Sequence, residues 1–192
     1  FQHITSQILI LKKGTIHLYV NMPCHAPCFA TVEAALNSIA YKEPVKTYPA
    51  AFTDVAPAIV HIGKGIYREK LVITRPNLTL LGEGNTREDV VLVYGDAAFD
   101  DMPEGDKRGT FRSASVRIDT HDFTAKHLTF QNDAGYGHTV GQALALYVDG
   151  DRNYFEDCCL IGSQDTLFTA PLPLKEAKPG GFKGPGEHKP RV

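Results

Sequence analysis

The chain has 192 residues, of which 43% are hydrophobic and 22% charged, and these values exclude low-complexity disorder for most of its length. Its formal net charge of −2 provides no basic field that would attract nucleic acid or an acidic membrane surface. No apolar run approaches the roughly 20 residues of a transmembrane helix, and the N-terminal residues lack the features of a signal peptide. We expect one folded domain with a neutral or weakly charged partner.

Residues 31–39 carry the helical periodicity of the chain. Apolar side chains at 32, 35, 36 and 39 follow the spacing of an amphipathic helix. Thr31 is a suitable N-cap, and Glu33 suits the positive end of the first turn. The pattern predicts a helix at this point.

Beyond residue 39 the chain consists of short β-rich runs separated by Gly, Asn and Asp. The predicted strands cover residues 58–62, 70–73, 78–81, 90–93, 114–118, 128–130, 143–148 and 158–161. Many short strands separated by turns are typical of a sandwich, a barrel or a β-solenoid.

A weak internal repeat favours the β-solenoid among these folds. Residues 123–132 can be aligned with residues 153–162 at an offset of 30 positions (155 minus 125). The alignment pairs Ala125 with Phe155, Leu128 with Cys158, and Phe130 with Leu160. A period of this size indicates stacked units, and hairpin signals such as Asn-Gly between paired strands are missing. The sequence predicts an all-β parallel β-helix whose N-terminal end is capped by the 31–39 helix.

Four cysteines are too few for a disulfide scaffold. Cys24 and Cys28, with His25 between them, are candidate metal ligands, but a zinc site usually needs two close pairs. Cys158 and Cys159 are adjacent, and adjacent strand residues point to opposite faces. We therefore expect no metal and no cofactor. Whether the cysteines are small buried hydrophobes or form one disulfide stays open.

Two further segments are expected to be solvated. The acidic run Asp96 to Asp106 fits no EF-hand spacing and is predicted to be a solvated loop. Residues 171–192 contain five Pro and four Gly, which favours an extended loop or tail. Contact of its Lys and Arg residues with a uronic-acid substrate is the alternative.

Two glutamines and an aspartate are candidates for chemistry. Gln164 and Asp165 follow a predicted strand directly, and Gln142 opens another. An Asp before Thr commonly bonds its own backbone in a turn, and a lone Gln usually only ends a strand. Stacked coils, however, place residues at equivalent positions close together on one outer face.

Seven segments resemble the pectin methylesterase family in the same order as they occur there. They include GIYREKLVI at 65–73 and QDTLF at 164–168, together with residues 29–35, 77–84, 109–115, 130–135 and 138–146. The resemblance spans residues 29–170. It implies a right-handed parallel β-helix that is secreted, uses no cofactor or metal, and removes methyl esters from the galacturonate units of pectin.

The resemblance also implies roles for particular residues. In that family a carboxylate nucleophile attacks the ester, a second carboxylic acid serves as acid and base, and side-chain amides stabilise the oxyanion. Asp165 matches the acid/base, and Gln142 and Gln164 match the anion hole. Thr110 and Phe168 match substrate-binding positions. The family commonly has His directly before the first Gln, whereas Val140 and Gly141 intervene here, so we expect His138 to be a surface residue.

The nucleophile and the substrate-binding Arg of the family have no match in this chain. No Asp follows Asp165, no Trp is present, and Glu176 and Glu187 lie in the Pro/Gly-rich segment. We therefore expect a C-terminally truncated β-helix that is inactive as this chain, with a lead-in at 1–28, a β-helix at 29–170 and a tail at 171–192.

Two other functions remain open. A non-catalytic pectin-binding β-helix fragment is the first alternative. A β-helix lyase or hydrolase on the same polymer is the second, and a lyase would need a Ca²⁺-binding carboxylate cluster that the sequence does not show. An apolar last coil left uncovered also predicts oligomers or aggregates, because terminal repeats need a cap.

Overall fold

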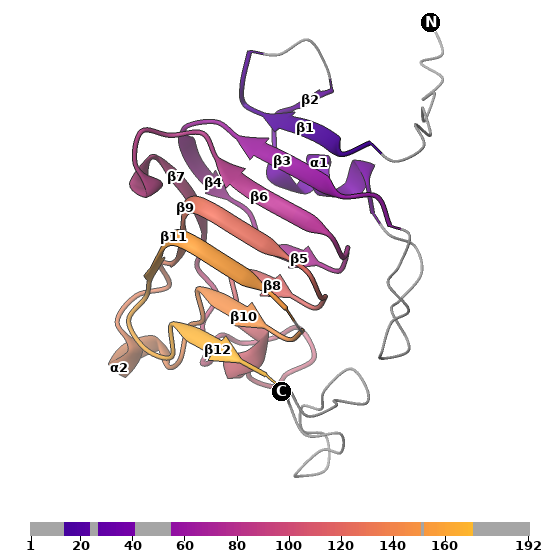
Figure 1. Cartoon of the computed structure of the whole chain (residues 1–192). Coiled ribbons are helices and arrows are strands. Elements are labelled where there is room, and N and C mark those ends of the chain that lie inside the picture. The colour runs from indigo at the N-terminus through magenta and orange to yellow at the C-terminus, as the bar shows by residue number, and fades with distance from the viewer. Residues whose placement is uncertain (1–13, 24–26, 41–54, 151, 171–192) are drawn as a thin grey trace, which may run out of the picture.

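The computed structural model describes residues 14–23, 27–40, 55–150 and 152–170, and in these ranges parallel strands stack in successive layers (Figure 1). The strands are β1 (Ile16–Val20), β2 (Cys28–Phe29), β3 (Ala58–Ile62), β4 (Gly65–Arg68), β5 (Leu71–Ile73), β6 (Leu78–Gly82), β7 (Val90–Tyr94), β8 (Val116–Ile118), β9 (Thr124–Asn132), β10 (Leu146–Val148), β11 (Tyr154–Ile161) and β12 (Leu167–Thr169). The helices are α1 (Val32–Ser38) and α2 (Gly137–Val140), with the short 3-10 helices η1 (Arg87–Asp89) and η2 (Thr110–Arg112).

The strands form two parallel sheets. The larger has the order β2-β1-β3-β6-β9-β7-β4, with β11 also paired to β9, and the smaller has the order β12-β10-β8-β5. The first part of β9 pairs with β6 and its last part with β7, so this one strand runs along two faces of the solenoid. With the smaller sheet as the third face, the parallel β-helix predicted from the sequence is confirmed.

The turn between the first two faces is built by residues with left-handed backbone. His127 in β9 has φ of 57°, and Asp157 in β11 has φ of 49°. One coil earlier Gly82 lies so close to the His127 carbonyl oxygen that a Cβ there would be 2.0 Å from it. The side chains of His127 and Asp157 form a hydrogen bond of 2.5 Å between Nδ1 and Oδ2, which joins neighbouring coils at the bend.

The predicted repeat is confirmed residue by residue. In the β9–β11 pair Ala125 lies opposite Phe155, Leu128 opposite Cys158, and Phe130 opposite Leu160. The core follows from the same stacking, because Val60, Leu80 and Ala125 succeed one another at one register position and are all fully buried. Alternating side chains of each strand thus bury one face against the next coil.

Helix α1 confirms the helix predicted over 31–39. Thr31 Oγ1 accepts a hydrogen bond of 3.1 Å from the Ala34 amide, as an N-cap should. The Glu69 carboxylate accepts two more, from the Val32 amide at 3.0 Å and the Glu33 amide at 2.7 Å. Because Glu69 belongs to the GIYREKLVI segment, part of that segment's pattern serves the fold. The helix packs against β1, β2 and β3, and its role as the cap of the solenoid stays a prediction.

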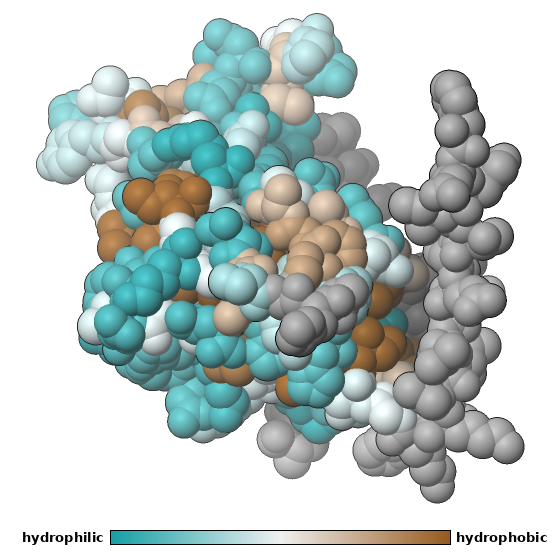
Figure 2. Space-filling model, turned by 90° about the horizontal axis from the view of Figure 1, so that it is seen from above, coloured by the Kyte–Doolittle hydropathy of each residue, from teal (hydrophilic) through white to brown (hydrophobic). Residues whose placement is uncertain are grey.

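The surface at the β1 end of the stack alternates polar and apolar patches (Figure 2). In the described part of the chain no helix is long and apolar enough to cross a membrane. Cys28 is disulfide-bonded, which agrees with the one-disulfide alternative, whereas Cys158 and Cys159 are half-buried free thiols. Cys24 and His25 lie outside the described residues, as does the predicted tail at 171–192, and the three proposed chain divisions stay predictions.

Candidate functional site

Four of the candidate residues, Thr110, Gln142, Gln164 and Asp165, lie on the segments that lead into β8, β10 and β12, and Phe168 lies in β12 itself. A ladder of backbone hydrogen bonds joins these segments across the stack. The Gly109 amide donates to the Ala98 carbonyl at 3.0 Å, and the Ala98 amide donates to the Gln142 carbonyl at 2.8 Å. The Ala143 amide then donates to the Gln164 carbonyl at 3.1 Å. The ladder places Gln142 and Gln164 on neighbouring coils. Thr110 lies at the other end of the ladder, because it directly follows Gly109.

A buried asparagine holds this arrangement from inside. Asn132 is 5% exposed, and the two N–H groups of its Nδ2 are shared among three carbonyl oxygens within hydrogen-bonding distance, those of Asp96 at 2.9 Å, Ser113 at 3.2 Å and Leu144 at 3.0 Å. The Ser113 hydroxyl donates to the Thr110 carbonyl at 2.6 Å and accepts from the Leu144 amide at 3.1 Å. The backbone on either side of the site is thus fixed by two buried polar side chains. Sequence reasoning missed both, although each lies in a segment that carried the resemblance.

Asp165 and Gln164 lie at the turn before β12, which is an edge strand of the smaller sheet. Asp165 is exposed and has left-handed backbone with φ of 56°. Among the described residues no group bonds its carboxylate, so the carboxylate is not held by a turn of its own backbone. The Gln164 side chain rests against Gly137 at the start of α2, where a Cβ would come within 2.5 Å of it.

Phe168 belongs to a cluster of aromatic rings on the outer face of the smaller sheet. Its ring stacks on Tyr147 with centroids 5.3 Å apart and contacts Phe111 at 4.8 Å. The Arg117 guanidinium lies 4.2 Å from the centre of the Tyr147 ring, where a cation is favoured by the ring quadrupole. Burial raises the pKa of the Tyr147 hydroxyl to about 12, so the phenol stays neutral. Tyr147 was missed because it lies in an apolar run, but its strand position opposite Phe168 is the signal that finds it.

The acidic run at 96–106 is only partly the solvated loop that the sequence predicted, because Asp101, Glu104 and Asp106 are exposed whereas Asp96 is buried. Asp96 is only 8% exposed, and Lys70 and Arg108 both pair with it, the latter at 2.9 Å. Arg108 also binds Asp100 at 3.1 Å. The prediction was wrong for Asp96 because two basic residues that are distant from it in the sequence, Lys70 and Arg108, pair with it in the fold. The loop is therefore fastened beside the ladder that carries Ala98.

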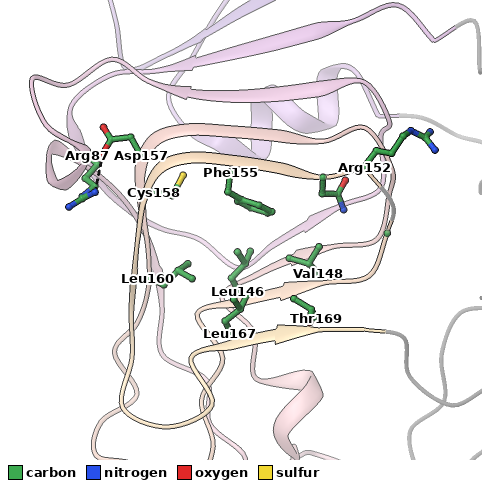
Figure 3. A pocket seen from close by; sticks show the side chains of 12 residues that line it. Arg87, Leu146, Val148, Arg152, Phe155, Asp157, Cys158, Leu160, Leu167 and Thr169 are labelled. Atoms are coloured by element: carbon green, nitrogen blue, oxygen red, sulfur yellow. Dashed lines mark hydrogen bonds and ion pairs between the residues drawn. The ribbon is translucent and has the colours of Figure 1, made fainter. Parts of the chain in front are cut away.

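The remaining candidates take no part in this arrangement. His138 is exposed on α2, as expected for a surface histidine. In the described ranges no group of three His, Cys, Asp or Glu side chains is arranged to hold a metal ion. A hollow of about 610 Å³ lies between β11 and the strands β10 and β12, where Phe155 and Leu160 face Leu146 and Leu167 (Figure 3). It is the apolar interior of a coil, and none of the candidate site residues line it.

The arrangement offers one exposed carboxylic acid, two amide side chains from neighbouring coils and a cluster of aromatic rings. Neutral amide donors can stabilise an oxyanion, and a carboxyl group can exchange a proton with a leaving group. The partly exposed rings of Phe111 and Phe168 provide apolar surface for a ligand with C–H faces.

Comparison with known proteins bears on this arrangement. Residues 29–172 match the family model described as Pectinesterase. "Pectinesterase A" of Dickeya chrysanthemi is 37% identical over 142 residues, which cover 67% of this chain and 37% of the relative. "Pectinesterase QRT1" of Arabidopsis thaliana is 38% identical over 113 residues, 57% of this chain and 30% of the relative.

Solved structures agree with the sequence matches. Pectin methylesterase PemA from Erwinia chrysanthemi aligns with a TM-score of 0.66 and 32% identity, covering 82% of this chain and 46% of that one. A pectin methylesterase in complex with a hexasaccharide aligns with a TM-score of 0.65 and 31% identity, at the same two coverages. The chain thus spans less than half the length of these relatives.

Proposed function

The chain belongs to the pectinesterase family, and on that premise we propose that its site takes part in removing methyl esters from the galacturonate units of pectin. The observation that carries the proposal is the backbone ladder that brings Gln142 and Gln164 onto neighbouring coils beside Thr110. The amides of two stacked coils can converge on one developing negative charge, which isolated strand-end glutamines cannot do.

We assign the roles as follows. Gln142 and Gln164 donate to the oxyanion that forms when the ester carbonyl is attacked. Asp165, in its acid form, gives a proton to the departing methanol and as a carboxylate takes one from the water that completes hydrolysis. Thr110 and Phe168 contact the sugar chain. The partly exposed rings of Phe168 and Phe111 give that contact an apolar surface, and the buried Tyr147 ring packs against Phe168.

The attacking carboxylate has no counterpart among the assigned residues. No Asp follows Asp165 in the sequence, and without a nucleophile the covalent route is closed. We infer that this 192-residue chain binds methylated pectin but does not hydrolyse it. Binding without catalysis is also the second candidate function, in which the same groove serves recognition alone. Secretion to a pectin-containing wall follows from the family and belongs to the proposal.

Two measurements test the proposal. Titration with methyl-esterified hexagalacturonate should show binding that Gln142→Ala and Thr110→Ala weaken and that Gln131→Ala, on another face in β9, leaves unchanged. Methanol release from methylated pectin should be absent, and should appear when the chain is extended by a family segment that supplies the nucleophile, unless Asp165→Asn is introduced.

The outcomes separate the two candidates. Methanol release that depends on Asp165 in the extended chain supports the esterase. No release from the extended chain, with binding retained, favours recognition alone. Absence of binding by every form contradicts both.

A further inference from the structure

Two large aromatic side chains are exposed beside the candidate site without belonging to the ring cluster described above. Phe99 is 55% exposed and Tyr136 is 72% exposed. Each lies next to one end of α2, the four-residue helix between β9 and β10. Exposed aromatic surface that is gathered in one place commonly marks a binding surface.

Phe99 is seated on the backbone directly before Gln142. Its ring lies over Gly141, where a Cβ would meet the ring carbons at 2.9 Å. Gly141 also has φ of 82°, which favours glycine, so both its conformation and its missing side chain make room for the ring. The Phe99 amide donates to the Val140 carbonyl at 3.1 Å, which fixes the base of the side chain.

The loop that carries Phe99 is held on its other side as well. Arg108 pairs with Asp96 at 2.9 Å and with Asp100 at 3.1 Å, and the Ala97 amide donates to the Asp100 carboxylate at 2.8 Å. A ring held in place before the ligand arrives loses little conformational entropy on binding. Phe99 is therefore presented as a fixed apolar surface.

Tyr136 lies at the opposite end of α2, next to Gln164. It is the N-cap residue of the helix, and the following Gly137 donates its amide to Ser163 Oγ at 2.9 Å. The Gln164 side chain rests against the same Gly137. One short helix therefore connects both glutamines, with an exposed ring next to each connection.

We propose that Phe99 and Tyr136 form an aromatic wall that binds a pyranose ring of the galacturonan chain beside the unit held by Gln142 and Gln164. This inference rests on the proposed function and adds residues that the family resemblance did not supply. The C–H faces of a pyranose are apolar and weakly positive, and they pack on the negative face of an aromatic ring, while the hydroxyl groups stay in water. Phe99 packs on Val140 and Gly141. These are the two residues that intervene before Gln142, where the family commonly has His directly before Gln.

The experiment uses the whole chain with unesterified and methyl-esterified hexagalacturonate as probes. Calorimetric titration gives the Kd, and saturation-transfer NMR with irradiation of aromatic protons reports which sugar C–H groups lie on a ring. We compare Phe99→Leu and Tyr136→Leu with Tyr154→Leu, which removes a ring of similar exposure, 54%, from β11. Phe99→Tyr keeps the ring and serves as the rescue.

Phe99→Leu and Tyr136→Leu should each raise the Kd about three- to tenfold, the range expected for loss of one aromatic contact, and reduce transfer to the sugar protons. Phe99→Tyr and Tyr154→Leu should behave like the unmodified chain. If both Leu variants bind normally while Gln142→Ala binds weakly, the aromatic wall is wrong and the proposed function stands. If the unmodified chain binds neither probe, both fail together.

Discussion

Strands β9 and β11 lie side by side with the same pattern of side chains, yet the same position is buried in one and open in the other. Phe130 in β9 is fully buried, whereas Leu160 opposite it in β11 is 36% exposed. β9 is covered by β6, β7 and β11, while β11 pairs with β9 alone among the described strands (Figure 1). Burial in a solenoid therefore depends on whether a further coil covers the residue. The alternation of apolar side chains along a strand predicts only which of them point inward.

The largest effect expected from this comparison is on stability. Phe130→Ala should lower the free energy of unfolding by about 3–5 kcal/mol, because it removes a fully buried ring and leaves a cavity. Leu160→Ala should cost about 1 kcal/mol, since its site is partly open and few neighbours lose contacts. Urea unfolding followed by circular dichroism measures both. Equal losses would show that the β11 face is covered as well as the β9 face.

An intermediate loss of stability is expected when the buried side chain that holds the site backbone, Asn132, is removed. Asn132→Ala removes the side-chain donor of the Asp96 and Ser113 carbonyls, whereas the Leu144 carbonyl keeps its bond from the Ser115 amide, and the change should cost about 2–3 kcal/mol. Asn153→Ala is the matched change in the next coil, where the side chain is less buried and bonds the Phe123 amide and the Thr120 carbonyl. It should cost about 1 kcal/mol, because water can replace the lost partners.

Urea unfolding midpoints of the two variants compare the two losses of stability, provided that the dependence of the unfolding free energy on urea concentration is unchanged. A loss for Asn132→Ala no larger than that for Asn153→Ala would contradict the idea that Asn132 holds the site backbone.

The repeated part of the fold was predictable because it rests on side chains that alternate inward. The pairing of residues 123–132 with 153–162 and the helix at Val32–Ser38 both followed from such patterns. The short strands β2, at Cys28–Phe29, β4, at Gly65–Arg68, and β12, at Leu167–Thr169, were missed. Such short runs carry too little alternation to predict a strand, and they extend only because a neighbouring coil offers a ladder of hydrogen bonds.

The site was predictable to the extent that it follows the stacking. Gln142 and Gln164 were expected on one outer face because one coil separates them, and the ladder brings them together. Their roles came from resemblance alone and stay proposals. The buried support by Asn132, and the pairing of Asp96 with Arg108 and Lys70, depend on which side chains the fold brings into contact, and no local pattern encodes that.

The smallest effect concerns the bond between the coils at the bend. The His127 hydrogen bond, with the nearby Arg87 charge, lowers the pKa of the Asp157 carboxyl below its ordinary value. A lowered folded-state pKa gives stability that is present above the ordinary Asp pKa of about 4 and is lost as the pH falls through the lowered value. Asp157→Asn keeps a residue that tolerates φ of 49° but removes the charge. The variant should therefore melt below the unmodified chain at a pH of about 6, and this difference should vanish as the pH falls well below about 4.

His127→Asn supplies the internal control, because it removes the other partner at a position that also has left-handed backbone. Melting temperatures of the two single variants and the double variant, measured at a pH of about 6 and again in acid, form a double-mutant cycle. Coupling should be present near neutral pH and absent in acid, because protonation of Asp157 removes what the pair contributes. Coupling that persists unchanged into acid would mean that the side chains of His127 and Asp157 stabilise the bend between β9 and β11 by packing and not by charge.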